Sequence, residues 1–164
     1  YFSGEEERRR VTREMFDRAA AGYDEAERWT GLGTGPWYRR DVLRQSGLQS
    51  GMHVLDVAAG TGLVTVAAHE LIGPQGRVVA LDPSPGMLAE LKKKLPVETL
   101  VGYAEDIPLP DASVDFVSMG YALRHVGDLD GILPRAAAGR AGLPDGNQPP
   151  RQPHRADAAL RLHP

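Results

Sequence analysis

The sequence has no cysteine among its 164 residues, which excludes disulfide bonds, thiolate metal sites and a cysteine nucleophile. No apolar run approaches the roughly 20 residues of a membrane-spanning helix. No secretory signal precedes the first expected helix, so we expect a cytoplasmic protein without a membrane span. The net charge of −3 offers no basic excess for binding nucleic acid, and no group of histidine and acidic residues has the spacing of metal ligands.

The composition is that of one folded domain, with 41% hydrophobic and 25% charged residues. From residue 51 onward, short apolar runs alternate with helical patterns. Strands are predicted at about residues 53–57, 77–81, 98–101 and 114–119, and helices at about residues 62–71 and 85–94. This alternation predicts an α/β fold, a Rossmann-like doubly wound parallel sheet with strand order 3-2-1-4 that lacks its later strands.

Both predicted helices have an apolar stripe that we expect to face the sheet. The stripes consist of Leu63, Val66, Ala67 and Leu71 in the first helix and of Met87, Leu88 and Leu91 in the second. Three lysines, Lys92, Lys93 and Lys94, end the second helix, where positive charge suits the helix dipole. We interpret them as a solvated helix end and not as a phosphate site.

A helical segment is predicted in front of the sheet. An amphipathic helix over about residues 5–21 should end at Gly22, and a second helix should span about residues 37–46. Both tryptophans and two of the five tyrosines fall between residues 23 and 38. These aromatic residues either anchor a mobile segment onto the core or form a lid over a hydrophobic substrate, and the sequence leaves both interpretations open.

The composition changes after residue 131. Residues 132–164 hold 6 of the 13 prolines, no aromatic residue, no valine and no lysine, and 21 of these 33 residues are Arg, Ala, Pro or Gly. One interpretation is a disordered natural tail. The other, which we favour because an expected helix and strand are also missing, is that the sequence leaves its reading frame near Gly131 in a G/C-rich gene. The predicted parts are therefore a helical lid (residues 1–47), an incomplete Rossmann-like domain (48–131) and an irregular tail (132–164).

The stretch from His53 to Gly62 joins a buried strand to a glycine turn and the start of a helix. Glycines in such a turn let the backbone approach a ligand, and the helix N-terminus offers free N–H groups. In a doubly wound sheet, ligands bind at the carboxyl ends of the strands. Asp56 lies inside the end of the first strand, and Asp82 ends the second. Asp82 suits a ribose, because a carboxylate can accept hydrogen bonds from both of its hydroxyls.

The two acids distinguish S-adenosylmethionine from a dinucleotide. A dinucleotide site has Gly-x-Gly-x-x-Gly with no acid ahead of it, whereas here Thr65 takes the third glycine position and Asp56 precedes the loop. Asp56 would repel a pyrophosphate but suits a cationic ligand. S-adenosylmethionine carries a sulfonium, an ammonium and a ribose diol, and it has no phosphate. We therefore predict S-adenosylmethionine as the cofactor and disfavour a nicotinamide-dependent oxidoreductase.

Several segments resemble those of a known enzyme superfamily, the class I S-adenosylmethionine-dependent methyltransferases. Its first, second and third motifs are similar to residues 54–62, 79–88 and 102–109. Within the superfamily, the ubiquinone/menaquinone biosynthesis C-methyltransferases are the most similar, on residues 15–24, 37–40 and 121–126. The resemblance covers about residues 11–130 and none of the tail.

The resemblance implies roles for individual residues. Gly60, Thr61 and Gly62 would contact the methionine part of the cofactor. Asp82 would hold the ribose, and Met87 would pack near the adenine.

The sequence departs from the family pattern at two positions. Tyr103 stands where the third motif has Asp or Asn for the adenine amino group, so that the Ala104 backbone and Glu105 or Asp106 are the implied substitutes. Gly120 stands where the quinone enzymes often have Ser. The complete predicted cofactor site consists of Asp56, Ala58, Gly60, Thr61, Gly62, Asp82, Pro83, Met87, Tyr103, Ala104, Glu105 and Gly120.

The predicted function is methyl transfer from S-adenosylmethionine to a small aromatic or quinone-like acceptor. The sulfonium already activates the methyl group, so the protein mainly aligns the reactants and excludes water. A base helps when a phenol-type ring carbon is the nucleophile, and Tyr23, Arg124 and His125 are the candidates on the substrate side. The alternative is a truncated, inactive cofactor-binding or assembly module. In that case, the exposed edge of the fourth strand would favour a homodimer.

Overall fold

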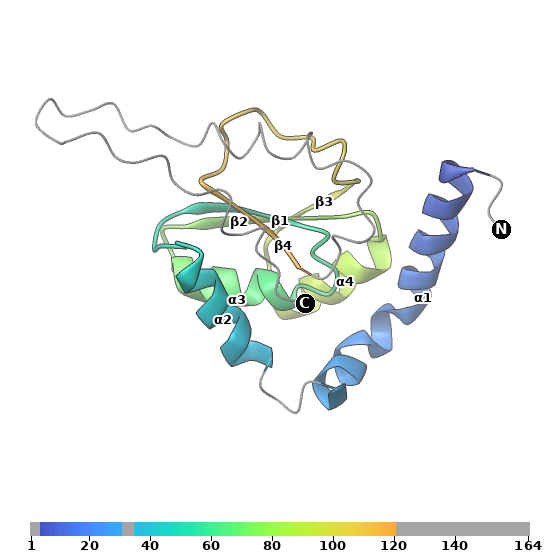
Figure 1. The fold of residues 1–164 in the computed structure, drawn as a ribbon, viewed down its shortest axis with the longest axis horizontal. Helices are drawn as coiled ribbons and strands as arrows, with labels where there is room; N and C mark the ends of the chain where they lie inside the picture. Colours follow the sequence, from blue (N-terminus) through green and yellow to red (C-terminus); the bar gives the residue numbers. More distant parts are fainter. Residues whose placement is uncertain (1–3, 31–34, 121–164) are drawn as a thin grey trace, which may run out of the picture.

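The computed structural model describes residues 4–30 and 35–120, and its centre is a four-stranded sheet (Figure 1). The strands are β1 (His53–Val57), β2 (Arg77–Asp82), β3 (Glu98–Val101) and β4 (Phe116–Met119). They are all parallel and lie in the order β3-β2-β1-β4. The Rossmann-like fold and the strand order predicted from the sequence are therefore confirmed.

The two central strands bring their carboxyl ends to the same edge of the sheet. In the pairing of β1 with β2, Asp56 lies opposite Ala80 and Val57 lies opposite Leu81. Since β1 and β2 are buried on both faces, their sequences are nearly continuous apolar runs. Apart from His53 and Arg77 at the strand starts, the aspartates are the exceptions, and the register places both beside the loop that follows β1.

Helices cover one face of the sheet. Figure 1 shows α3 (Leu63–Ile72) and α4 (Pro85–Lys94) on this face, with α2 (Gly35–Gln45) packed against α3. The core on this side contains Leu43 of α2, Ala68 and Ile72 of α3, and Val54 and Val78 of the strands. Leu88 and Leu91 of α4 pack on Ala80 in a neighbouring cluster.

The other face of the sheet is covered by the long connection from β3 to β4. Its apolar residues Ala104, Ile107 and Val114 pack on a group of strand residues, namely Leu55, Val57, Val79 and Leu81. The prediction that the prolines of this segment prevent a helix agrees with its irregular structure. β4 starts at Phe116 and not at Val114. The preceding Asp115 donates its backbone N–H to the carbonyl of His53, and its carboxylate accepts from the N–H of His53 at the start of β1.

The buried stripe predicted for α3 is partly wrong. Val66, Leu71 and Leu63 are only partly buried, and the fully covered positions are Thr65, Ala67, Ala68 and Ile72. The helix is rotated toward the sheet so that the Thr65 hydroxyl reaches the carboxylate of Asp56. In α4 the predicted stripe of Met87, Leu88 and Leu91 is buried as expected.

The prediction that the first helix ends at Gly22 is wrong, because α1 runs from Glu5 to Thr30. Gly22 is exposed and has nothing within 4 Å of its missing side chain. A glycine inside a helix costs only about 1 kcal/mol relative to alanine. Asp17 and Asp24, on either side of Gly22, fix the helix to the sheet domain, and these contacts offset that cost.

Three predictions concern residues outside the described part of the chain. They are the irregular tail at residues 132–164, the segment 121–126, and the candidates Arg124 and His125 within it. Among the helices of residues 4–30 and 35–120, none has the length and apolar character of a membrane-crossing segment.

Candidate functional site

A cavity of about 270 Å³ opens at the carboxyl ends of β1 and β2. Its floor consists of residues of the segment from Asp56 to Thr61 and of Asp82. Residues of α1, among them Phe16 and Tyr23, form its cover, and Arg39 of α2 contributes to its wall. The cavity therefore combines the strand ends with helices that precede the sheet in sequence.

Asp56 is fully buried at the floor of this cavity. Its carboxylate accepts hydrogen bonds from the hydroxyls of Thr65 (2.6 Å) and Ser118 (2.7 Å), which lie on α3 and β4. Burial raises the pKa of Asp56 to about 6, against the lowering effect of the two hydroxyls, and the nearby Asp82 raises it further. Asp56 therefore changes charge close to physiological pH.

Asp82 is also buried, but its hydrogen bonds come from the backbone. One carboxylate oxygen accepts from the N–H of Gly60 and the other from the N–H of Ser84, each at 2.8 Å. Burial raises the pKa of Asp82 above its ordinary value, while these two N–H groups lower it. Asp82 thus fixes the glycine loop after β1 to the turn after β2, and each oxygen keeps a lone pair for a ligand.

The glycine loop needs its glycines for two different reasons. Gly60 has a φ of +57° and lines the cavity, and a side chain there would meet nothing within 4 Å. Gly62 has a φ of +83°, but a Cβ at this position would lie 2.2 Å from Cδ1 of Leu91. Gly60 therefore leaves room at the ligand side, whereas Gly62 lets α3 start close against α4.

Asp24 of α1 and Lys94 of α4 hold Thr61 of the glycine loop from two sides. The Thr61 hydroxyl donates to the carboxylate of Asp24, and the ammonium of Lys94 donates to the Thr61 carbonyl at 2.8 Å. Lys94 also forms an ion pair with Asp24. Lys94 is exposed in the last turn of α4, as a solvated helix end requires, but that interpretation is incomplete because Lys94 also contacts α1 and the glycine loop.

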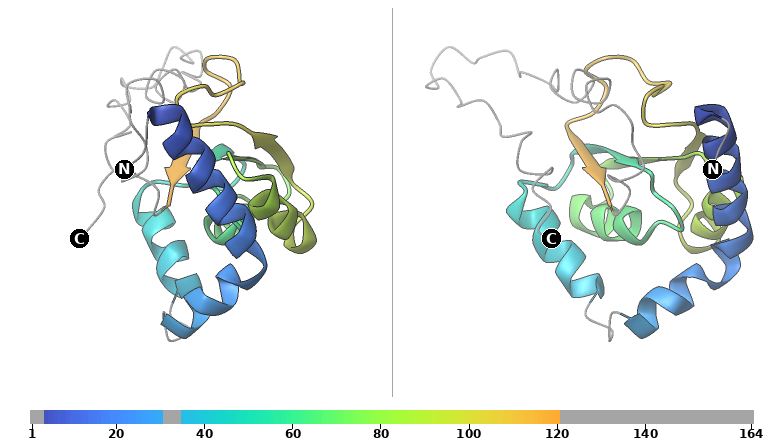
Figure 2. Two further views of the ribbon diagram at one scale, coloured as in Figure 1. Left: turned by 90° about the vertical axis from the view of Figure 1, so that its right-hand side faces the viewer. Right: turned by 45° about the vertical axis from the view of Figure 1, so that its right-hand side comes forward.

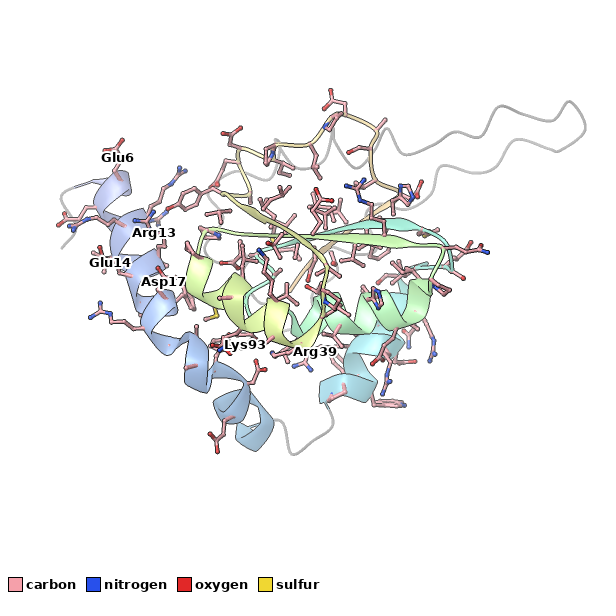
Figure 3. All side chains as sticks on the ribbon, turned by 180° about the vertical axis from the view of Figure 1, so that it is seen from behind. Glu6, Arg13, Glu14, Asp17, Arg39 and Lys93 are labelled. Carbon is pink, nitrogen blue, oxygen red and sulfur yellow. The ribbon has the colours of Figure 1, made fainter. Side chains whose placement is uncertain are left out.

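Asp17 attaches α1 to the other end of α4. Its carboxylate accepts from the Ser84 hydroxyl and from the N–H of Gly86 at 2.9 Å. The Ser84 hydroxyl, the main cause, lowers the pKa of Asp17. Asp24 follows Asp17 by seven positions, about two helical turns, so both lie on one face of α1. Figure 2 shows α1 alongside α4, and Figure 3 shows Asp17 where the two helices meet.

A third contact holds the N-terminal half of α1 over the loop after β3. The guanidinium of Arg9 lies 3.5 Å from the carboxylate of Glu105 and 5.0 Å from the ring centre of Tyr103. Both partners line the cavity. Tyr103, which departs from the family pattern, therefore contacts a cation of α1, a contact that the motif alone did not indicate.

The predicted cofactor residues lie around this cavity with two exceptions. Gly62 packs against α4, and Ala104 belongs to the core. Of the two implied substitutes for the adenine contact, Glu105 lines the cavity and Asp106 is exposed outside it. Within the described residues, no three histidine or acidic side chains gather as metal ligands would.

Of the three substrate-side candidates, Tyr23 lines the cavity and is 36% exposed. Sequence reasoning missed several lining residues of α1, including Arg9, Thr12 and Phe16. Their spacing of three and four residues places them on one face of the helix, and this spacing is the signal by which they could have been found. It also missed Arg39, although this residue lies in the segment 37–40 that resembles the quinone enzymes.

Comparison with known proteins shows which family the chain resembles. A model of the ubiE/COQ5 methyltransferase family matches residues 3–138. The demethylmenaquinone methyltransferase of Symbiobacterium thermophilum is 34% identical over 135 residues, which are 78% of this chain and 54% of that protein. The ubiquinone/menaquinone biosynthesis C-methyltransferase UbiE of Hahella chejuensis is 36% identical over 126 residues, with 73% and 51% of the two chains covered.

Among solved structures, a SAM-dependent methyltransferase from Aquifex aeolicus is similar in fold. It superimposes with a TM-score of 0.55 at 31% identity and covers 60% of this chain and 57% of its own. The chain thus spans about half the length of the curated relatives it matches.

Proposed function

Because the chain belongs to the ubiE/COQ5 methyltransferase family, we propose that its cavity binds S-adenosylmethionine and serves methyl transfer to a small quinone-type acceptor. The single observation that carries the proposal is the meeting of Asp56, Asp82 and the open glycine Gly60 at one cavity. Two carboxylates suit a ligand with cationic groups and a diol, and the absence of a side chain at Gly60 lets this ligand approach the backbone. A pyrophosphate would be repelled by the same carboxylates.

The residues present fit the cofactor part by part. Asp82 offers one free lone pair on each oxygen to the two ribose hydroxyls. Asp56 lies one strand away, where its carboxylate can pair with the ammonium group of the methionine part. Pro83 and Met87 follow β2 and line the cavity as an apolar surface for the adenine.

In the reaction, the bound cofactor would supply an activated methyl group. The residues of this chain align the reactants and exclude water. The cover formed by α1 shields the cavity, since Asp17 and Asp24 fix this helix to both ends of α4. Tyr23 lies in that cover and can hydrogen-bond a hydroxyl or carbonyl of the acceptor.

The acceptor follows from the family and from the apolar part of the cover. Several relatives are named for demethylmenaquinone, which is a quinone. Phe16 and Tyr23 line the cavity from α1 and provide aromatic surface against which a flat ring can stack. Of the described aromatic side chains between residues 23 and 38, Tyr23 lines the cavity and supports the lid interpretation, whereas Trp37 and Tyr38 are exposed and do not line it.

The cofactor proposal is tested by calorimetric titration of the full chain with S-adenosylhomocysteine, the product of the cofactor. Binding is expected with the native chain, with NAD as a negative control that neither binds nor raises the melting temperature. The variant Asp82→Ala should lose most of the affinity. No heat at high protein concentration, or equal binding by the variant, would exclude the proposed site.

A second candidate function is a cofactor-binding or assembly module without turnover. The observation behind it is the position of β4, which pairs with β1 on one side and has no further strand beside it among the described residues. An open strand edge favours pairing with another chain, for example a second copy. Sedimentation of the full chain together with an assay of methyl transfer to a demethylated quinol tests this. A monomer that turns over would exclude the module, and a dimer that binds but does not react would support it.

A further inference from the structure

Arg39 is a buried cation in the wall of the cavity. Its exposed fraction is 7%, although it belongs to α2, most of whose neighbouring side chains are exposed. Trp37, for example, is 67% exposed two residues earlier. A guanidinium shielded from bulk water attracts an anionic ligand group more strongly than an exposed arginine does. This residue therefore indicates which part of a ligand lies next to it.

The topology places Arg39 at one particular end of the cavity. Helix α2 packs against α3, and α3 starts directly after the glycine loop of β1 (Figure 1). The surfaces proposed for the adenine, Pro83 and Met87, follow β2 on the opposite side. Figure 3 shows Arg39 on the helix side of the sheet, at α2. The cation thus lies at the end where the methionine part of the cofactor would lie.

We propose that Arg39 binds the α-carboxylate of the methionine part, an inference that rests on the proposed cofactor. That carboxylate is the only anionic group of S-adenosylmethionine, which has no phosphate. A guanidinium can hold a carboxylate through two parallel hydrogen bonds. Together with Asp56 for the ammonium, Arg39 gives the zwitterionic end of the ligand one partner of each opposite charge.

The other arginines of the cavity are less suited to this role. Arg9 is engaged with Glu105 and Tyr103 on the side of β3. Arg8 and Arg13 are exposed on α1, and Arg13 lies close enough to Asp17 to lower its pKa. Since α1 packs against α4, these side chains belong to the cover and to the far side of the cavity from α2.

The test compares two ligands that differ at the methionine end. S-adenosylhomocysteine carries the amino acid group, whereas 5′-methylthioadenosine keeps the adenosine and the sulfur but lacks that group. Titration of the full chain with the variant Arg39→Met should show an affinity for S-adenosylhomocysteine that is lower by about ten- to a hundredfold. The affinity for 5′-methylthioadenosine should stay within about twofold of the native value, because that ligand has no carboxylate for a partner to hold. Arg39→Lys should recover part of the loss, because it restores the charge without the second hydrogen bond.

The controls separate this proposal from the proposed function and from misfolding. Arg44→Met removes an exposed arginine from the last turn of the same helix and should change neither affinity. Retained binding of 5′-methylthioadenosine shows that Arg39→Met is folded. If Arg39→Met or Arg39→Lys weakens both ligands equally, or leaves S-adenosylhomocysteine unaffected, the role of Arg39 is overturned while the cofactor site stands. If the native chain binds neither ligand, the proposed function itself fails.

Discussion

Two aspartates end neighbouring strands at the same cavity, and they are held in different ways. Asp56 accepts from the hydroxyls of Thr65 and Ser118, whereas Asp82 accepts from the backbone N–H groups of Gly60 and Ser84. A hydroxyl can turn and accept a hydrogen bond as well as donate one, but an N–H can only donate. Asp56 can therefore be replaced by an amide without losing its partners, whereas an amide nitrogen in place of either Asp82 oxygen would point at an N–H donor.

This difference gives the two acids different tasks. Asp82 holds two segments of backbone in place and offers its remaining lone pairs to a ligand. Burial raises the pKa of Asp56 to about 6, so its carboxyl group changes protonation state near that pH. A cation bound beside it would favour the anionic form. Ligand binding and pH should therefore act mainly through Asp56, and the shape of the loop should depend mainly on Asp82.

The largest expected effect is the dependence of stability on pH. The pKa of Asp56 is higher in the folded chain, at about 6, than its ordinary value of 3.8, so the folded state binds more protons between these values. The unfolding free energy of the ligand-free chain should therefore fall as pH rises from about 4 to about 6, by up to about 3 kcal/mol. The raised pKa of Asp82 acts in the same direction, and the lowered pKa of Asp17 opposes it.

Urea denaturation at pH 4, 5, 6 and 7 measures this slope. The variant Asp56→Asn should remove most of it and should be at least as stable as the native chain at pH 7, because it no longer buries a charge. A native slope that is unchanged in Asp56→Asn would show that another group is responsible.

The next effect in size is expected for Asp82→Asn. The amide nitrogen would face the N–H group of Gly60 or of Ser84. One hydrogen bond would then be lost, and two N–H donors would point at each other. The affinity for S-adenosylhomocysteine should fall by about a hundredfold. Calorimetry measures the affinity, and thermal unfolding should also show a lower melting temperature. If Asp82→Asn is as mild as Asp56→Asn, the distinction between the two acids is wrong.

A smaller effect on binding is expected for Asp56→Asn. The amide keeps partners in Thr65 and Ser118 but loses the charge for the ligand ammonium, so the affinity for S-adenosylhomocysteine should fall by about tenfold at pH 7.5. The native affinity should rise with pH through about 6, and the affinity of the variant should not. Calorimetry at several pH values detects both. Parallel pH profiles of the two proteins would contradict the assignment of the ammonium to Asp56.

The smallest effect is expected at the junction of the glycine loop with α1 and α4. Lys94→Met removes the ion pair with Asp24 and the hydrogen bond to the Thr61 carbonyl. Because this pair is partly exposed, the affinity for S-adenosylhomocysteine should fall only about three- to fivefold. The matched control is Lys93→Met, whose ammonium contacts only the neighbouring Glu90 in the described structure and should not affect binding. Equal behaviour of the two variants would mean that Lys94 does not support the loop.

Much of the sheet domain could be predicted because its signals are local. The strands His53–Val57 and Glu98–Val101 and the helix Pro85–Lys94 have the predicted bounds. In each case an apolar run or a capping serine such as Ser84 marks the element within a few residues. The same holds for Asp56 and Asp82, because an acid at the end of an apolar strand is recognisable as a candidate ligand-binding residue from its neighbours in the sequence.

The N-terminal helices could not be predicted with the same success. Gly22 is a local signal for a helix end, yet it is overridden by Asp24, which contacts Thr61 across a separation of 37 residues. Lys94 is likewise a helix-end lysine by its local pattern and a support of the glycine loop by a contact over 33 residues. Such contacts form only when one helix docks on another, which no pattern within either helix encodes.

The sequence by itself therefore determined the strands of the parallel sheet, the glycine turn and the two acids, because neighbouring residues show the apolar runs and the periodicity of strands and helices. Only the tertiary structure decided that α1 covers the cavity, that hydroxyls hold one acid and backbone holds the other, and that Arg39 is buried in the cavity wall. The physical reason is that these features depend on the positions of elements relative to one another, and many separate side-chain contacts together set those positions.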